Sequence, residues 1–260
     1  MKILCIGDVV SHVGREMLFR YVDELRYQKQ IDLVIANGEN ATHGRGMSRS
    51  AYNEIMRAGV DIVTMGNHTW NCREVIDIMR KEGNVIRPAN YNGDCPGEGS
   101  LIHTTRSGEK VGVINLIGRT YLEPSNSPFE SAEAEIEKLK KSTNIILVDF
   151  HAEATSEKLA MGYFLDGRVS TVFGTHTHVQ TADETIMPDG TGYITDLGMT
   201  GPQISILGRE KNSIINRFLS CVPQKFEIAD GKGQFCGCIF DIDNNSGLCT
   251  NLERIFIREQ

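Results

Sequence analysis

Short apolar runs that end in polar residues recur along the chain, and they constrain its fold more than any other feature. Ile3–Ile6, Leu33–Ala36, Asp61–Met65, Ile145–Phe150 and Val169–Phe173 are such runs. Continuous apolar runs of this length are typical of strands that are covered on both faces. Because open α/β sheets bind ligands at the carboxyl ends of their strands, the residues that follow these runs predict a binding site.

The residues at these strand ends are all of types that bind metals. They are Asp8, Glu39, Asn40, Asn67, His68, His151, His176 and His178. Any one of them alone is more often a capping or hydrogen-bonded polar residue than a metal ligand. Their recurrence at successive strand ends is not explained by capping, and it favours one shared metal site.

The order of the patterns predicts an α/β fold with a single domain over residues 1–260. Strands alternate with helical patterns as far as Arg80, which implies parallel pairing with right-handed crossovers. Ser100–Arg106 and Lys110–Ile117 flank a turn and predict a hairpin. We therefore expect a four-layer α/β/β/α sandwich, in which two packed mixed sheets are flanked by helices.

The pattern changes after Gly190, where short strands are separated by turns and antiparallel pairing is expected. The expected strands are Gly192–Asp196, Phe226–Asp230, Gln234–Asp243 and Leu252–Arg258. They are too few and too short to enclose a core of their own. We therefore expect residues 192–258 to contribute much of the second sheet.

Composition narrows the classes of partner. The formal net charge of −7 repels polyanions, so extended nucleic-acid binding is not expected, although a small phosphorylated ligand is compatible with it.

The seven cysteines are scattered and form no Cys-x-x-Cys motif, which is typical of reduced thiols in a cytoplasmic protein. The first apolar run is interrupted by Asp8 and is too short for a signal peptide or a membrane span.

The ligand types favour a pair of metal ions. Two ions about 3.5–4 Å apart share a ligand that touches both, and Glu39 is the candidate for that bridge. His176 and His178 are two residues apart, so in extended backbone both imidazoles would face one cavity. A set of imidazole, carboxylate and amide ligands suits iron, manganese, zinc or cobalt, and the lack of nearby cysteine argues against a closed structural zinc site.

The ordered motifs resemble those of the calcineurin-like metallophosphoesterases. The motifs are Gly7-Asp8, Gly38-Glu39-Asn40, Gly66-Asn67-His68, His151 and Gly174-Thr175-His176-Thr177-His178. The first lacks the usual Asp-x-His, and the second has Gly-Glu-Asn where Gly-Asp is usual. The whole chain is similar to the narrower YmdB-type branch, which resembles 2′,3′-cyclic-nucleotide 2′-phosphodiesterases.

This resemblance implies a role for each residue. Asp8, Glu39, Asn40 and His178 would hold one metal, and Glu39, Asn67, His151 and His176 would hold the other, with iron expected first and manganese second. His68 matches the proton donor to the leaving oxygen. The implied reaction is attack by a metal-bridging hydroxide on a 2′,3′-cyclic nucleotide, which leaves a 3′-nucleotide.

Two alternative functions remain open at this point. A phosphomonoesterase or phosphoprotein phosphatase would use the same metals with a different pocket, and a nucleotide-sensing regulator would keep the metals with negligible turnover. The complete ligand set together with His68 favours turnover, since sensing needs no acid. Arg45, Arg87 and Arg119 are candidates to bind phosphate. The expected partner is a small phosphorylated nucleotide, and self-association into a homo-oligomer is left open.

Overall fold

The computed structural model describes all 260 residues, with fourteen strands and six α-helices. The strands are β1 (Lys2–Ile6), β2 (Asp8–Val9), β3 (Leu33–Asn37), β4 (Ile62–Thr64), β5 (Val85–Ile86), β6 (Ser100–Thr104), β7 (Lys110–Ile117), β8 (Ile146–His151), β9 (Thr171–Thr175), β10 (Thr185–Ile186), β11 (Gly192–Ile194), β12 (Met199–Pro202), β13 (Gly233–Ile242) and β14 (Cys249–Arg258). The helices are α1 (Ser11–Lys29), α2 (Arg49–Arg57), α3 (Glu74–Glu82), α4 (Pro128–Leu139), α5 (Thr155–Leu165) and α6 (Lys211–Ser220).

The strands form two mixed sheets. The first has eight strands in the order β2-β12-β13-β1-β3-β4-β5, with β14 paired to β13. The second has six strands in the order β10-β11-β9-β8-β7-β6. The predicted parallel units are present, since β1, β3, β4 and β5 pair in parallel, and β6 and β7 form the predicted hairpin.

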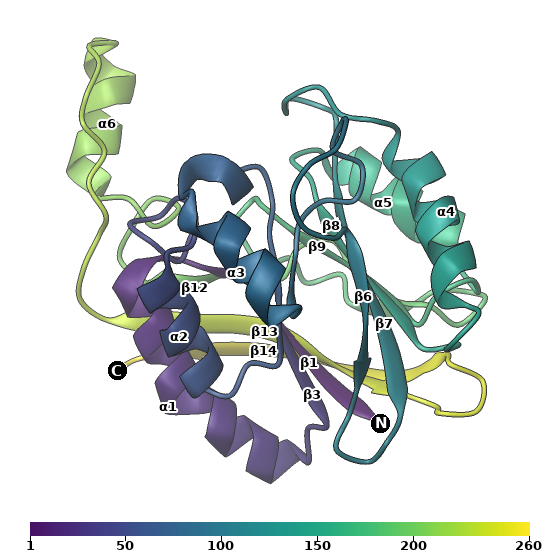
Figure 1. Cartoon of the computed structure of the whole chain (residues 1–260). Helices are drawn as coiled ribbons and strands as arrows, with labels where there is room; N and C mark the ends of the chain where they lie inside the picture. The colour runs from purple at the N-terminus through teal and green to yellow at the C-terminus, as the bar shows by residue number, and fades with distance from the viewer.

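Three apolar clusters separate four layers. On β1, Leu4 and Ile6 pack toward α1, α2 and α3, while Ile3 and Cys5 face the second sheet. A third cluster lies between the second sheet and helices α4 and α5. Figure 1 shows α1–α3 on one side of the two sheets and α4 and α5 on the other. The predicted α/β/β/α sandwich is therefore confirmed.

Local sequence explains where the helices begin and end. Ser48 caps α2, because its side chain accepts a hydrogen bond from the backbone nitrogen of Ala51 at 3.3 Å. Soon after α2 ends, Gly59 has φ +96°, a conformation that favours glycine. Only Gly7 separates the end of β1 from Asp8, so Asp8 lies at the carboxyl end of this strand.

The expectation that residues 192–258 supply much of the second sheet is wrong. Only β11 joins that sheet, whereas β13 pairs antiparallel with β1, in a register that places Lys2 opposite Asp241. The C-terminal hairpin therefore continues the first sheet on the free side of β1. Alternating patterns predict a strand but not which distant edge it joins, because pairing partners are set by packing across the whole chain.

The segment that carries α6 projects from the body of the protein (Figure 1). The predicted strand at Phe226–Asp230 is reduced to one isolated bridge between Arg209 and Ile228. Within α6 only Ile214 is buried, so the helix has little contact with the core. None of the six helices combines the length and the apolar character needed to cross a bilayer.

Candidate metal centre

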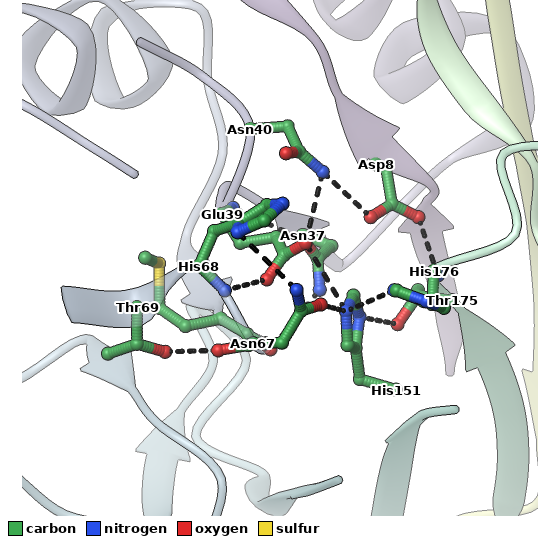
Figure 2. A network of polar contacts seen from close by, with 12 residues as sticks. Asp8, Asn37, Glu39, Asn40, Asn67, His68, Thr69, His151, Thr175 and His176 are labelled. Carbon is green, nitrogen blue, oxygen red and sulfur yellow. Dashed lines mark hydrogen bonds and ion pairs between the residues drawn. The ribbon is translucent and has the colours of Figure 1, made fainter. Parts of the chain in front are cut away.

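The polar strand ends of the two sheets meet at one place. The first sheet contributes Asp8, Glu39, Asn40 and Asn67, and the second sheet contributes His151, His176 and His178. Figure 2 shows the side chains of Asp8, Glu39, Asn40 and His151 directed toward one another. All seven residues that the sequence indicates as ligands are thus brought together.

One group of atoms surrounds Nε2 of His151. The Asn67 Oδ1 atom lies 2.9 Å away, Nδ1 of His176 lies 3.1 Å away, and Oε1 of Glu39 lies 3.2 Å away. A single ring nitrogen cannot donate to three acceptors at once. A cation between these atoms satisfies all of them, so the donor set fits a metal ion. Glu39, His151 and His176 each offer one ligand atom, and these atoms lie within 4.8 Å of one another.

A second group of atoms surrounds the side-chain amide of Asn40. Its Nδ2 atom lies 3.1 Å from Oε1 of Glu39, 3.2 Å from Nε2 of His178 and 3.4 Å from Oδ1 of Asp8. The same Asp8 oxygen is 3.7 Å from Nε2 of His178. Carboxylate and imidazole acceptors again converge on one point, so this group also fits a cation.

Glu39 belongs to both groups. Its Oε1 atom faces His151 and Asn40, while Oε2 accepts the backbone N–H of His68 at 2.8 Å. Gly66 makes this approach sterically feasible, because a Cβ atom there would lie 2.4 Å from both Oε2 of Glu39 and Nε2 of His151. Glu39 is therefore the carboxylate that contacts both groups of converging atoms.

The two histidines of the Gly174–His178 motif do not lie in extended backbone. His176 has φ +99° and His178 has φ +64°, so the sequence-based argument that they face one side of a strand is wrong. Positive φ values are unfavourable for residues with a Cβ atom and persist only where surrounding contacts impose them. This backbone conformation directs the side chain of His176 toward His151 and that of His178 toward Asp8 and Asn40.

A buried ion pair imposes this conformation. Between the two histidines, Thr177 donates its backbone N–H and its hydroxyl to Oδ2 of Asp196, at 3.1 and 2.7 Å. The same oxygen accepts from the Lys158 ammonium at 2.6 Å, and both charged side chains are at most 2% exposed. The ion pair thus anchors the loop that presents His176 and His178.

Hydrogen bonds on the far side of each imidazole orient its metal-facing nitrogen. The Thr175 hydroxyl donates its single proton to Asp149 at 2.7 Å. Toward Nδ1 of His151, 2.9 Å away, its oxygen can therefore act only as an acceptor, so Nδ1 of His151 carries a proton. Nδ1 of His178 lies 3.2 Å from the carbonyl oxygen of Leu207. When the rings are neutral, these partners leave Nε2 of both as the lone-pair atom that faces the site, as in metal-binding histidines generally.

Burial and charge shift the pKa values in the centre. Burial disfavours the ionised form of Glu39, but the neighbouring His151 and His68 outweigh it and lower the pKa of Glu39 to about 2. Burial also disfavours charged His151, but Glu39 outweighs it and raises the pKa of His151 to about 9. Without a metal, a proton on His151 therefore supplies the positive charge that the group of acceptors requires.

His68 lines the cleft above the centre, which has a volume of about 290 Å³. Its side chain is not among the atoms that converge on His151 or Asn40, which is consistent with the sequence-based expectation that it is not a ligand. Burial is the main cause that lowers the pKa of His68 below its usual value.

Only one of the three arginines indicated by the sequence lies at the cleft. Arg45 lines it, whereas the guanidinium of Arg87 donates to the carbonyl oxygens of Pro88 and Cys95, and Arg119 is exposed elsewhere. Arg209 lines the cleft too, and it donates to the carbonyl oxygen of Gly44 at 3.0 Å. Arg209 was not expected from the sequence, because it comes from the projecting segment, far along the chain.

Other residues around the centre were also missed. Glu153 lies 3.1 Å from Nε2 of His176, on the side of the ring that faces away from His151. Asp149 and Asp196 accept hydrogen bonds from Thr175 and Thr177, the residues next to the site histidines. The signal for Asp149 was present, since a carboxylate inside an otherwise apolar buried strand requires a polar partner.

The chain has close relatives among known proteins. A family model described as YmdB-like protein matches residues 4–255. The chain belongs to the YmdB-like family. It is 47% identical over 259 residues to 2′,3′-cyclic-nucleotide 2′-phosphodiesterase of Bacillus subtilis (strain 168), a match that covers 100% of this chain and 98% of the relative.

Two solved structures of similar sequence share the fold of this YmdB-like chain. One is a hypothetical protein from Thermus thermophilus, with a TM-score of 0.93, 39% identity and 100% coverage of both chains. The other is a novel phosphatase from Mycoplasma pneumoniae, with a TM-score of 0.93 and 37% identity over 99% of this chain and 93% of that one. The resemblance to the YmdB-type branch, inferred from the motifs, is confirmed.

Proposed function

We propose that the protein is a dinuclear metal-dependent phosphodiesterase that converts 2′,3′-cyclic nucleotides into 3′-nucleotides. The observation that carries this proposal is the sharing of Glu39 between two groups of converging ligand atoms. A shared carboxylate is what a pair of ions needs at about 3.5–4 Å separation. The 47% identical Bacillus subtilis relative bears the name of that activity and supports the choice of substrate.

In this proposal, Asp8, Glu39, Asn40 and His178 hold one ion, and Glu39, Asn67, His151 and His176 hold the other. Asn40 would turn its amide so that the oxygen, rather than Nδ2, faces the ion. We expect iron first and manganese second, because the ligands are nitrogen and oxygen atoms without thiolate. When bound, such ions acidify water and offset the charge on phosphoryl oxygens.

The chain's own residues complete the reaction. His68 lines the cleft, with its backbone N–H bonded to Oε2 of Glu39, and its imidazole would protonate the 2′ oxygen as it leaves, a task that suits this group. Arg45 and Arg209 line the same cleft and supply guanidinium groups for the remaining phosphoryl oxygens. The buried ion pair of Lys158 and Asp196 keeps His176 and His178 in their strained positions.

Product analysis tests this proposal against its rivals. Metal-loaded protein is incubated with 2′,3′-cyclic AMP or with p-nitrophenyl phosphate, and the products are separated by chromatography, with Glu39→Gln as the control. We expect 3′-AMP from the cyclic nucleotide, slower release from the monoester, and almost no turnover by the variant. Preference for the monoester would favour a phosphatase. Tight binding of the cyclic nucleotide with no more turnover than Glu39→Gln would favour a sensor.

A further inference from the structure

A second cavity adjoins the cleft of the metal centre. It has a volume of about 270 Å³, and the side chains of His178 and Leu207 line both cavities. His178 is one of the proposed ligands, so the second cavity opens next to the place where the phosphoryl group would bind. The proposed mechanism uses none of this space.

One wall of the second cavity is built by the outer face of β14. Alternate residues of a strand face opposite sides, and Arg254, Phe256 and Arg258 face the cavity while Ile255 and Ile257 pack into the core. Phe256 is 47% exposed, so part of its ring surface is accessible to a ligand in the cavity. Val179 and Leu207 add further exposed apolar surface, at 61% and 50% exposure.

The two arginines of this wall differ in their partners. Arg254 is paired with Glu184 at 3.0 Å and also contacts Gln180 at 3.4 Å. The guanidinium of Arg258 lies 4.9 Å from the ring centre of Phe256, and no carboxylate lies within 4.0 Å of it. Arg258 is thus an unneutralised cation in a protein whose formal net charge is −7. It is available to an anionic ligand.

We propose that this second cavity binds a second nucleotide, so that the preferred substrate is a short oligoribonucleotide ending in a 2′,3′-cyclic phosphate. The base of the penultimate nucleotide stacks on Phe256, and Arg258 pairs with the phosphate that joins the two nucleosides. A mononucleoside cyclic phosphate has a single phosphate, which the metal centre takes, and it leaves Arg258 without a partner. This proposal rests on the proposed function, since it extends the same site.

Steady-state kinetics with two substrates tests the proposal. The substrates are 2′,3′-cyclic AMP and the dinucleotide ApA with a terminal 2′,3′-cyclic phosphate. For the wild type we expect a KM about tenfold lower for the dinucleotide, the scale of one base–aromatic stacking contact. Phe256→Ala and Arg258→Gln should remove most of this difference and leave KM and kcat for 2′,3′-cyclic AMP unchanged.

A matched pair elsewhere provides the control. The Arg168 guanidinium lies 5.0 Å from the ring centre of Phe164, much as that of Arg258 lies over Phe256, but Arg168 is also paired with Glu133 at 3.2 Å. Arg168→Gln should leave both substrates unaffected. Equal KM values for the two substrates in the wild type would overturn the proposal. So would a Phe256→Ala variant that raises both KM values equally, because the cavity would then hold the base of the mononucleotide.

Binding of reaction products separates failure of this proposal from failure of the proposed function. Calorimetric titration with ApA 3′-phosphate and with 3′-AMP requires no turnover. About tenfold tighter binding of the dinucleotide, lost in Arg258→Gln, would support the second-nucleotide site even in a protein that hydrolysed neither substrate. Equal affinities would reject that site even if 2′,3′-cyclic AMP were hydrolysed rapidly.

Discussion

The Oε1 atom of Glu39 lies 3.2 Å from Nε2 of His151, and both side chains are buried. In the absence of metal this contact is an ion pair, because the pKa of Glu39 is lowered to about 2 and that of His151 is raised to about 9. A metal ion at the same place requires a neutral imidazole. Metal binding and protonation of His151 therefore compete.

The metal-free protein should lose stability as the pH rises from about 6.5 to about 9. His151 binds its proton more tightly in the folded chain, so its contribution is complete below the unfolded pKa near 6.5 and is lost as the pH rises through the folded value. Glu39 stays ionised throughout, since its contribution is lost only as the pH falls toward about 2. Urea unfolding of chelator-treated protein across this range measures the effect.

Metal affinity should increase as the pH rises, whereas the stability of the metal-free protein should fall. Binding displaces one proton from His151, so the association constant should increase by up to about tenfold per pH unit between about pH 6.5 and 9. Calorimetric titration in buffers of different ionisation enthalpy counts the protons released. Affinity that does not change with pH, with no proton release, would contradict the ion pair.

His68→Ala should separate an acid from a ligand. If His68 protonates the leaving oxygen, metal content stays near that of the wild type, and hydrolysis of 2′,3′-cyclic AMP falls roughly 10²–10⁴-fold. The loss should be smaller for a p-nitrophenyl ester, whose leaving group needs little protonation. His103→Ala on β6 serves as the control. Equal losses on both substrates, or a His68→Ala protein without metal, would assign this residue to another role.

Thr177→Val should weaken metal binding without unfolding the protein. The change keeps the shape of the side chain but removes the hydroxyl that donates to Asp196 at 2.7 Å. The strained loop then holds His176 and His178 less firmly, and we expect metal affinity to fall about 10–100-fold, as for other partners of metal ligands. Metal titration measures the affinity, and thermal unfolding shows whether the variant stays folded. Thr185→Val on β10, which is exposed, is the matched control, and an equal loss of affinity there would refute the explanation.

The local sequence was sufficient to place the polar strand ends at one site. Asp8, Glu39 and His151 each follow or end an apolar run, and the rule that ligands bind at the carboxyl ends of strands marked all three as site residues, although Asp8 and Glu39 belong to the first sheet and His151 to the second. Local patterns could not give the positive φ values of His176 and His178, because these depend on the contact of Thr177 with Asp196. They also could not show that β13 joins β1, or that Arg209 reaches the cleft, because both depend on packing between distant segments.

Titration of metal into metal-free protein, with initial rates of 2′,3′-cyclic AMP hydrolysis as the readout, tests the central claim most directly. We predict that activity reaches its plateau at two equivalents of iron or manganese per chain, and that Glu39→Gln stays near zero at every point while remaining folded. A plateau at one equivalent, or full activity in Glu39→Gln, would contradict a dinuclear centre that shares this carboxylate.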